Sequence, residues 1–215
     1  MMRNISIAVV SVLLAAMAGN TMAVEEAKYT VAIQQDKLEV REYEPSIVAE
    51  VVVEDTFEDA SGTAFRRLFN YISGENTGRD KIAMTSPVTQ QQAPEKIAMT
   101  SPVGQRKSDQ GWAVSFMMPA SYTMDTIPLP NDPSVVLREI PAYRAAAIRY
   151  SGGWSEKSYN KHLSQLLEWI EAEKLETAGE PLWARYNAPF TPWFMRRNEI
   201  LIPIHDRRSL SQVSR

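Results

Sequence analysis

The stretch Val40-Arg-Glu-Tyr-Glu-Pro-Ser-Ile-Val-Ala-Glu-Val51 has a counterpart later in the chain, Leu137-Arg-Glu-Ile-Pro-Ala-Tyr-Arg-Ala-Ala-Ala-Ile148. Each copy places a proline between two runs rich in apolar residues, which predicts two strands joined by a turn. Because either half alone is too short to bury both faces of a sheet, we expect the halves to share one core. The pattern therefore predicts one domain with an internal repeat, over about residues 30–125 and 134–204.

An amphipathic helix is predicted after each copy. In the first half, apolar residues recur at helical spacing over residues 57–72, and Gly74 follows where a helix would end. In the second half, Ser155 is a suitable N-cap for a stripe over residues 159–170, which ends before Gly179. Further strands are predicted at residues 81–88, 96–103, 112–118, 182–187 and 199–204. The fold class predicted from these elements is α+β: a distorted antiparallel β-barrel of two ββαββ halves with two α-helices outside.

Composition and charge restrict the classes of function. The chain has 215 residues, of which 44% are hydrophobic and 23% charged, as expected for a globular protein. Lys and Arg total 23 against 26 Asp and Glu, so no basic surface for nucleic acid is indicated. The absence of cysteine excludes disulfides, thiolate metal sites and covalent haem attachment through thiols. Imidazole chemistry is left to two residues, His162 and His205.

The N-terminal segment, residues 1–23, has the pattern of a secretory signal peptide. A short basic start precedes an apolar run over residues 5–19, shorter than the roughly 20 residues that a membrane-spanning helix needs. Small residues at Thr21 and Ala23 suit a signal peptidase. We therefore expect cleavage after Ala23, a mature domain over residues 24–215 without an integral membrane span, and a periplasmic location if the source is a Gram-negative bacterium. An uncleaved N-terminal anchor is the alternative.

One octapeptide occurs twice. Lys81-Ile-Ala-Met-Thr-Ser-Pro-Val88 recurs without change at residues 96–103, and the polar segment between the copies is typical of a turn. The repeat is either a tandem duplication that lengthens a hairpin or a pair of segments that both line a site. In the second case Met84 and Met99 are candidate ligand contacts, because flexible thioethers suit adaptable apolar pockets.

No motif for catalysis is present. The chain lacks the G-x-S-x-G elbow, the H-E-x-x-H zinc motif and the glycine-rich phosphate loops, so the sequence gives no specific reason to predict an enzyme. His162 lies beside the apolar stripe of the second predicted helix, where it is either a hydrogen-bonded boundary residue or a metal ligand. His205 follows the last predicted strand in a polar tail, where a function is less expected.

Aromatic, proline and arginine residues gather between Trp183 and Glu199. Such a segment can form an apolar slot with a cationic rim, which suits a flat ligand that carries carboxylates. The alternative is structural: an aromatic core with surface arginines that pair with acids such as Glu199.

Six separated motifs in this order resemble the SOUL haem-binding protein family. They are Val40-Arg-Glu-Tyr43 with Pro45, Lys81-Ile-Ala-Met-Thr-Ser-Pro-Val88, Trp112-Ala-Val-Ser-Phe-Met-Met-Pro119, Arg149-Tyr-Ser-Gly-Gly153, Tyr186-Asn-Ala-Pro189 and Arg197-Asn-Glu199. The resemblance covers residues 29–204. It implies a distorted β-barrel of two repeated halves flanked by two helices, and non-covalent binding of haem or another tetrapyrrole without turnover.

The resemblance also implies a ligand site on the first helix. Large apolar residues expected there match Phe65 and Phe69. The axial histidine of one branch is replaced by Glu42 here, and two basic positions of some members fall at Gly62 and near Thr191. The basic residues that can take their place at the propionates are Arg66, Arg67, Arg196 and Arg197. His162 is the candidate axial ligand that remains.

We therefore expect an exported, non-enzymatic protein that holds haem or a related tetrapyrrole on an apolar surface, with a small-molecule partner and no nucleic acid. One alternative is an envelope protein-interaction or stress module that keeps the fold and has lost the ligand. An enzyme that acts on a porphyrin is the third hypothesis. No protein partner is indicated by the sequence.

Overall fold

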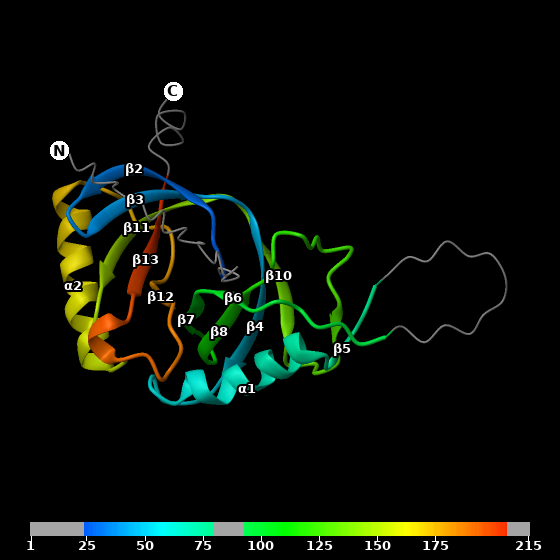
Figure 1. Ribbon diagram of the computed structural model, residues 1–215. Helices are drawn as coiled ribbons and strands as arrows, with labels where there is room; N and C mark the ends of the chain where they lie inside the picture. The colour runs from blue at the N-terminus through cyan, green and yellow to red at the C-terminus, as the bar shows by residue number, and fades with distance from the viewer. Residues whose placement is uncertain (1–23, 80–92, 206–215) are drawn as a thin grey trace, which may run out of the picture.

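The computed structural model describes residues 24–79 and 93–205. The predicted signal segment, the predicted strand at residues 81–88 and the candidate contact Met84 therefore lie outside the described residues. In the described part, an antiparallel sheet has the order β10-β4-β8-β7-β12-β13-β11-β3-β2 (Figure 1). Its strands are β2 (Tyr29–Gln35), β3 (Leu38–Tyr43), β4 (Ser46–Val53), β7 (Val103–Ser108), β8 (Gly111–Met117), β10 (Val136–Ile140), β11 (Tyr143–Tyr150), β12 (Leu182–Arg185) and β13 (Asn198–Ile204).

The strands of the two halves interleave at the edges of this sheet. Strand β10 from the second half pairs with β4, and β3 from the first half pairs with β11, while β7 and β12 meet in the middle. Two separate two-stranded sheets accompany it: β1 (Glu25–Glu26) lies parallel to β6 (Thr100–Ser101), and β5 (Asn76–Thr77) is antiparallel to β9 (Leu129–Pro130). The internal repeat stays a prediction.

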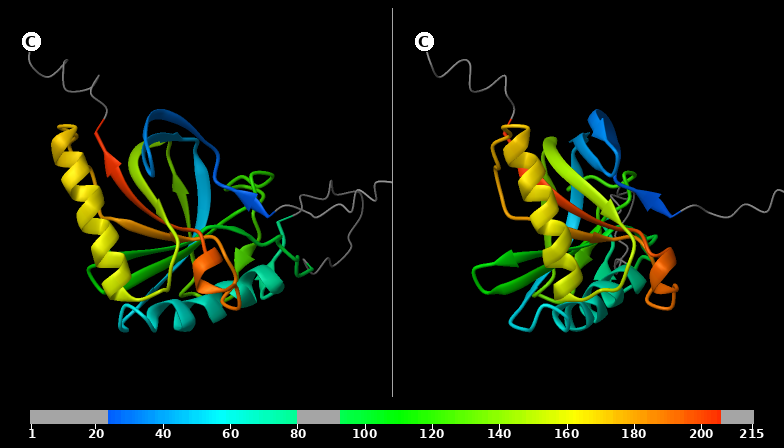
Figure 2. Two further views of the ribbon diagram at one scale, coloured as in Figure 1. Left: turned by 60° about the vertical axis from the view of Figure 1, so that its left-hand side comes forward. Right: turned by 90° about the vertical axis from the view of Figure 1, so that its left-hand side faces the viewer.

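Two helices lie outside the curl of the sheet, which confirms the predicted α+β class and distorted barrel (Figure 2). Helix α1 (Ala60–Ser73) buries Leu68 and its neighbours against β4 and β8, and α2 (Glu156–Ala172) buries Leu166 against β11 and β13. Since side chains alternate along a strand, residues such as Ala49 and Val51 face α1, and the residues between them face the concave side.

The helix ends follow the sequence signals. Gly74 closes α1 at a φ of 123°, a conformation that glycine adopts without the penalty of a Cβ. The hydroxyl oxygen of Ser155 accepts a hydrogen bond from the N–H of Ser158 at 3.3 Å, which caps the start of α2. Helix α2 ends at Ala172, and Lys174, rather than a glycine, takes the left-handed conformation with a φ of 53°.

The strand predicted over residues 96–103 is largely wrong. Only Thr100 and Ser101 form a short strand there, and β7 begins at Val103. The N–H of Ile97 donates to the carbonyl of Ile72 at the end of α1, at 2.8 Å. The backbone of this segment therefore makes one of its hydrogen bonds to the end of α1 and not to a neighbouring strand. Pro102 has no N–H to donate to a strand.

Candidate functional site

Helix α1 presents an apolar strip on its exposed side. Gly62, Phe65, Arg66 and Phe69 share this side because they are spaced by three or four residues. The rings of Phe65 and Phe69 lie 5.9 Å apart between centroids with an interplanar angle of 11°, and Phe65 also meets Phe116 edge-on at 5.2 Å. Phe69 is 46% exposed. The two matched helix positions therefore form a stacked pair in which Phe65 packs against the core and Phe69 is exposed.

The segment that precedes β7 runs back along the same helix. It starts beside the end of α1, where Ile97 bonds to Ile72, and reaches Val103, which pairs with Arg185 on β12. The guanidinium of Arg185 donates to the hydroxyl of Ser61 in the first turn of α1. Met99 belongs to this segment and is 42% exposed.

The connection between β12 and β13 adds a second exposed apolar surface. It includes the short helix η1 (Trp193–Met195), drawn in orange in Figure 2. Phe190 is 90% exposed, and Trp193, Phe194 and Met195 are each at least 60% exposed. Apolar groups gathered in this way are uncommon on a soluble monomer and mark binding surfaces.

Two arginines border these surfaces. Arg196 donates to the carbonyl oxygens of Thr191 and Pro189, at 2.8 and 2.7 Å, and its guanidinium carbon lies 4.2 Å from the centroid of Trp154. Arg185 lies over the same ring, at 5.2 Å, and is buried. Arg196 is thus fixed by its backbone contacts, and the two cations share one aromatic platform.

Arg185 is a buried cation without a carboxylate. Among the described residues its Nε has no hydrogen-bond partner and no ion pair involves it. Burial lowers the pKa of its guanidinium to about 10, against a smaller rise from Tyr150. A buried charge normally requires a counter-ion, so an uncompensated arginine is typical of an anion site. Arg185 was not among the predicted site residues, although it lies within the aromatic segment between Trp183 and Glu199.

Of the predicted site residues, the structure brings Phe65 and Phe69 together, while Met99 lies on the segment before β7 and Arg196 on the β12–β13 connection beside Trp154. Arg66 is exposed on the same helix, in a shallow depression with the carboxylates of Asp55 and Asp59. Arg197 points elsewhere, because its guanidinium bonds to Glu199 at 3.0 Å and to Glu26 at 2.8 Å. That pairing occupies Arg197, so we do not retain it as a propionate partner.

His162 lies on the other helix, α2. Its Nδ1 is 2.7 Å from the carbonyl oxygen of Ser158, and its ring stacks on Tyr150 at 3.8 Å. Burial lowers the pKa of this imidazole, and the nearby charges of Lys37 and Lys161 lower it further. The hydrogen bond to the Ser158 backbone acts in the opposite direction and raises the pKa. These contacts make it a hydrogen-bonded boundary residue, remote in the fold from the phenylalanine pair. In residues 24–79 and 93–205, no group of three or more His, Asp or Glu side chains could hold a metal ion.

A buried ionic network lies on the concave side of the sheet. Glu199, fully buried, accepts from Arg41 at 2.6 Å, from Arg197 at 3.0 Å and from the hydroxyl of Tyr186 at 2.9 Å. Burial is the largest influence on its pKa and raises it, but these three donors together hold the pKa below its usual value. Arginines therefore do pair with Glu199, as one hypothesis expects, but the pairing lies in the interior and not at the surface.

These observations define an α+β half-barrel domain with exposed aromatic side chains on its first helix and on the β12–β13 connection, where Arg185 and Arg196 lie over Trp154. The family model described as SOUL heme-binding protein matches residues 24–203, and the chain belongs to this family. No helix among the described residues is long and apolar enough to cross a membrane.

Curated relatives include Heme-binding protein 1 of Xenopus tropicalis and of Xenopus laevis. They are 26% and 24% identical to this chain over 163 residues, which is 75% of this chain and 80% of each relative. Among solved structures, a chain of the EcmrR–DNA complex superposes with a TM-score of 0.55 at 12% identity and covers 79% of this chain and 57% of that one. An uncharacterized conserved protein from Listeria innocua gives 0.52 at 11% identity, with 80% and 93% covered. Both structures share the fold.

Proposed function

We propose that this protein binds haem or a related tetrapyrrole, without covalent attachment, on the face between α1 and the β12–β13 connection. Membership of a haem-binding family and the haem-binding names of its relatives support the ligand class. Two observations support the location: aromatic side chains are exposed on α1 and on the β12–β13 connection, and Arg185, which bonds to Ser61 on α1, is a buried cation without a counter-ion among the described residues.

The chemistry of this face fits both parts of a haem. Its porphyrin ring is flat and apolar, and the stacked pair Phe65 and Phe69, with Met99 and the aromatic side chains of η1, offers a matching surface. Its propionates are anionic, and Arg185 and Arg196 can hold them by charge-assisted hydrogen bonds. The bound haem would supply an iron centre that can take further ligands or exchange electrons.

The proposed mode has no strong axial ligand. Family members of one branch supply a histidine where this chain has Glu42, and neither histidine of this chain approaches α1. His162 lies on α2, where its ring contacts the carbonyl oxygen of Ser158 and stacks on Tyr150. His205 is exposed after the end of β13. We therefore propose that apolar contact and propionate pairing hold the ligand, and that the protein binds it without turnover.

Replacing Arg185 with methionine tests the role of the buried cation. Haemin affinity is expected to fall about tenfold, because a charge-assisted hydrogen bond contributes roughly 1.5–3 kcal/mol. Haemin dimethyl ester, which lacks the propionate charges, should bind the variant and the wild type alike in a Soret titration. The matched control is Arg149→Met, since Arg149 is an exposed arginine on β11, away from α1. Equal losses for haemin and its ester would contradict the assignment.

The location of the mature protein is a further proposal. The N-terminal segment supports export, with cleavage after Ala23. Expression of the full chain in a Gram-negative host should give a periplasmic product whose N-terminal sequence starts at Val24. A product that keeps Met1 and stays with the membrane fraction would support the uncleaved anchor instead.

An envelope interaction module remains the second candidate function. The four exposed apolar residues over 190–195 favour it, because a protein partner can cover such a surface as well as a porphyrin can. The haemin experiments separate the two candidates, since the module has no affinity for a tetrapyrrole.

A further inference from the structure

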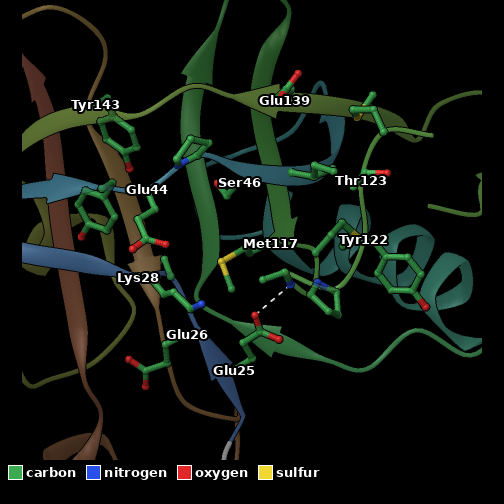
Figure 3. A pocket seen from close by; sticks show the side chains of 18 of the residues that line it. Glu25, Glu26, Lys28, Glu44, Ser46, Met117, Tyr122, Thr123, Glu139 and Tyr143 are labelled. Carbon is green, nitrogen blue, oxygen red and sulfur yellow. Dashed lines mark hydrogen bonds between the residues drawn. The ribbon is translucent and has the colours of Figure 1, made fainter. Parts of the chain in front are cut away.

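Two adjoining cavities lie on the concave side of the sheet, away from α1. The inner one has a volume of about 280 Å³. Its apolar lining includes Val48, Met117, Leu182, Leu201 and Pro203. The outer one has about 420 Å³ and is shown in Figure 3. Both are lined by Tyr43, Tyr143 and Met117, so the apolar interior continues into the outer cavity. The combined space is of the size that small-molecule sites have.

Tyrosine rings form one wall of this space. Tyr43 and Tyr143 stack with centroids 5.0 Å apart at an interplanar angle of 10°, and Tyr186 lines the inner cavity beside them. Burial raises the pKa of the Tyr143 phenol to about 12, against a smaller lowering by Arg41, so the ring is neutral at physiological pH. Neutral aromatic faces attract cations, and the thioether of Met117 adds a polarisable contact.

Carboxylates dominate the charged groups around the two cavities. The acidic lining residues are Glu25, Glu26, Glu44, Glu50, Asp125, Glu139 and Glu180, and the basic ones are Lys28 and Arg106. Glu26 pairs with Arg197, and Glu50 pairs with Arg106 and Arg138. Figure 3 shows Glu44 and Glu139 at the outer cavity, and neither has an ion pair or side-chain hydrogen bond with another described residue. The opening therefore carries a net negative charge.

The distribution of these acids decides which kind of cation fits. In the described part of the chain no three of them converge as metal ligands. A small hard cation would find no coordination shell here, whereas a large organic cation gains from a diffuse negative field, aromatic faces and an apolar interior. An organic anion would be repelled at the opening.

We propose that the concave face is a second ligand site, which takes a compact organic cation with aromatic or alkyl substituents, such as a quaternary ammonium or phosphonium ion. This site does not share a lining residue with the α1 face. Binding of the cation at this site therefore does not depend on tetrapyrrole binding.

The probes are tetraphenylphosphonium and tetraphenylborate, two ions of the same shape and opposite charge. Isothermal titration of the full mature domain is expected to show one site for the cation at micromolar to tens of micromolar concentration and none for the anion. Because the carboxylates at the opening are exposed, the affinity should fall as the ionic strength rises. Equal binding of both ions, or no binding of the cation at millimolar concentration, would overturn the proposal.

Variants locate the cation. Joint replacement Glu44→Gln and Glu139→Gln should weaken binding about fivefold, as expected for the loss of two exposed charges near the ligand. Tyr143→Leu keeps apolar packing, removes the ring and should weaken binding by about the same factor. Joint replacement Glu168→Gln and Glu171→Gln at two exposed positions of α2 is the control with an equal change of charge and should have no effect. Unchanged affinity in both the Glu44/Glu139 variant and Tyr143→Leu, or loss of cation binding in Phe69→Asp alone, would contradict the location.

Discussion

Replacing Arg41 with methionine is expected to lower the free energy of unfolding by about 3–5 kcal/mol, the usual effect of removing one partner from a buried ion pair. Arg41 supplies the shortest bond to Glu199 and holds it from two nitrogens, at 2.6 and 3.3 Å. Without it, a fully buried carboxylate keeps only Arg197 and Tyr186. Urea unfolding followed by tryptophan fluorescence measures the loss.

The control is Arg149→Met on β11, an exposed arginine whose replacement should change stability by less than about 0.5 kcal/mol. Equal stability of the Arg41 variant and the control would mean that Glu199 does not depend on its partner.

The same pair predicts how stability responds to pH. In the wild type the pKa of Glu199 is lower folded than unfolded, so its contribution is present above its ordinary value of 4.5 and is lost as the pH falls through the folded pKa. In the Arg41 variant burial dominates and raises the folded pKa, so acidification protonates the carboxyl and relieves the penalty. The stability difference between variant and wild type should therefore shrink between pH 7 and pH 4. A constant difference would contradict this account.

Replacing Phe69 with aspartate is expected to weaken haemin binding at least about tenfold while the fold is kept. The side chain is 46% exposed and contributes little to the core, yet full burial of a phenylalanine under a ligand is worth roughly 1.5–3 kcal/mol. The aspartate also places a negative charge beside the propionates. Soret titration gives the affinity, and far-ultraviolet circular dichroism checks the helix content.

Leu167→Asp is the matched control for Phe69→Asp. Leu167 is 43% exposed on α2, so the change has the same chemistry and similar exposure on the other helix. It should leave haemin affinity unchanged. A comparable loss in both variants would show that haemin binds without preference for α1.

The fold could be predicted because its signals are local. Apolar periodicity and the caps at Gly74 and Ser155 define both helices, and the repeated strand–proline–strand pattern predicts a shared sheet. The segment at residues 96–103 was misjudged because alternating apolar residues are equally compatible with an extended loop. Its hydrogen bond to Ile72 joins residues far apart in the sequence, which periodicity cannot detect.

The site was predicted in part for a related reason. Phe65 and Phe69 follow from helical spacing together with the family resemblance, but spacing does not tell an inward arginine from an outward one. Arg197 pairs with Glu199, whereas Arg185, which follows the apolar residues 182–184 on β12, has no carboxylate partner among the described residues. Burial of Arg41 with Glu199 depends on the pairing of β3 with β11 and of β11 with β13, which only the assembled sheet provides.

The most direct test of the central claim is a haemin titration of the purified mature domain, with the Soret band and tryptophan fluorescence recorded together. We predict a shifted Soret band and quenched fluorescence that saturate at about one equivalent, with Trp193 on η1 as the exposed reporter beside the proposed site. The His162→Ala variant should give the same spectrum, since the proposed mode does not use that imidazole. A titration that stays flat at micromolar haemin would contradict tetrapyrrole binding and favour the interaction module.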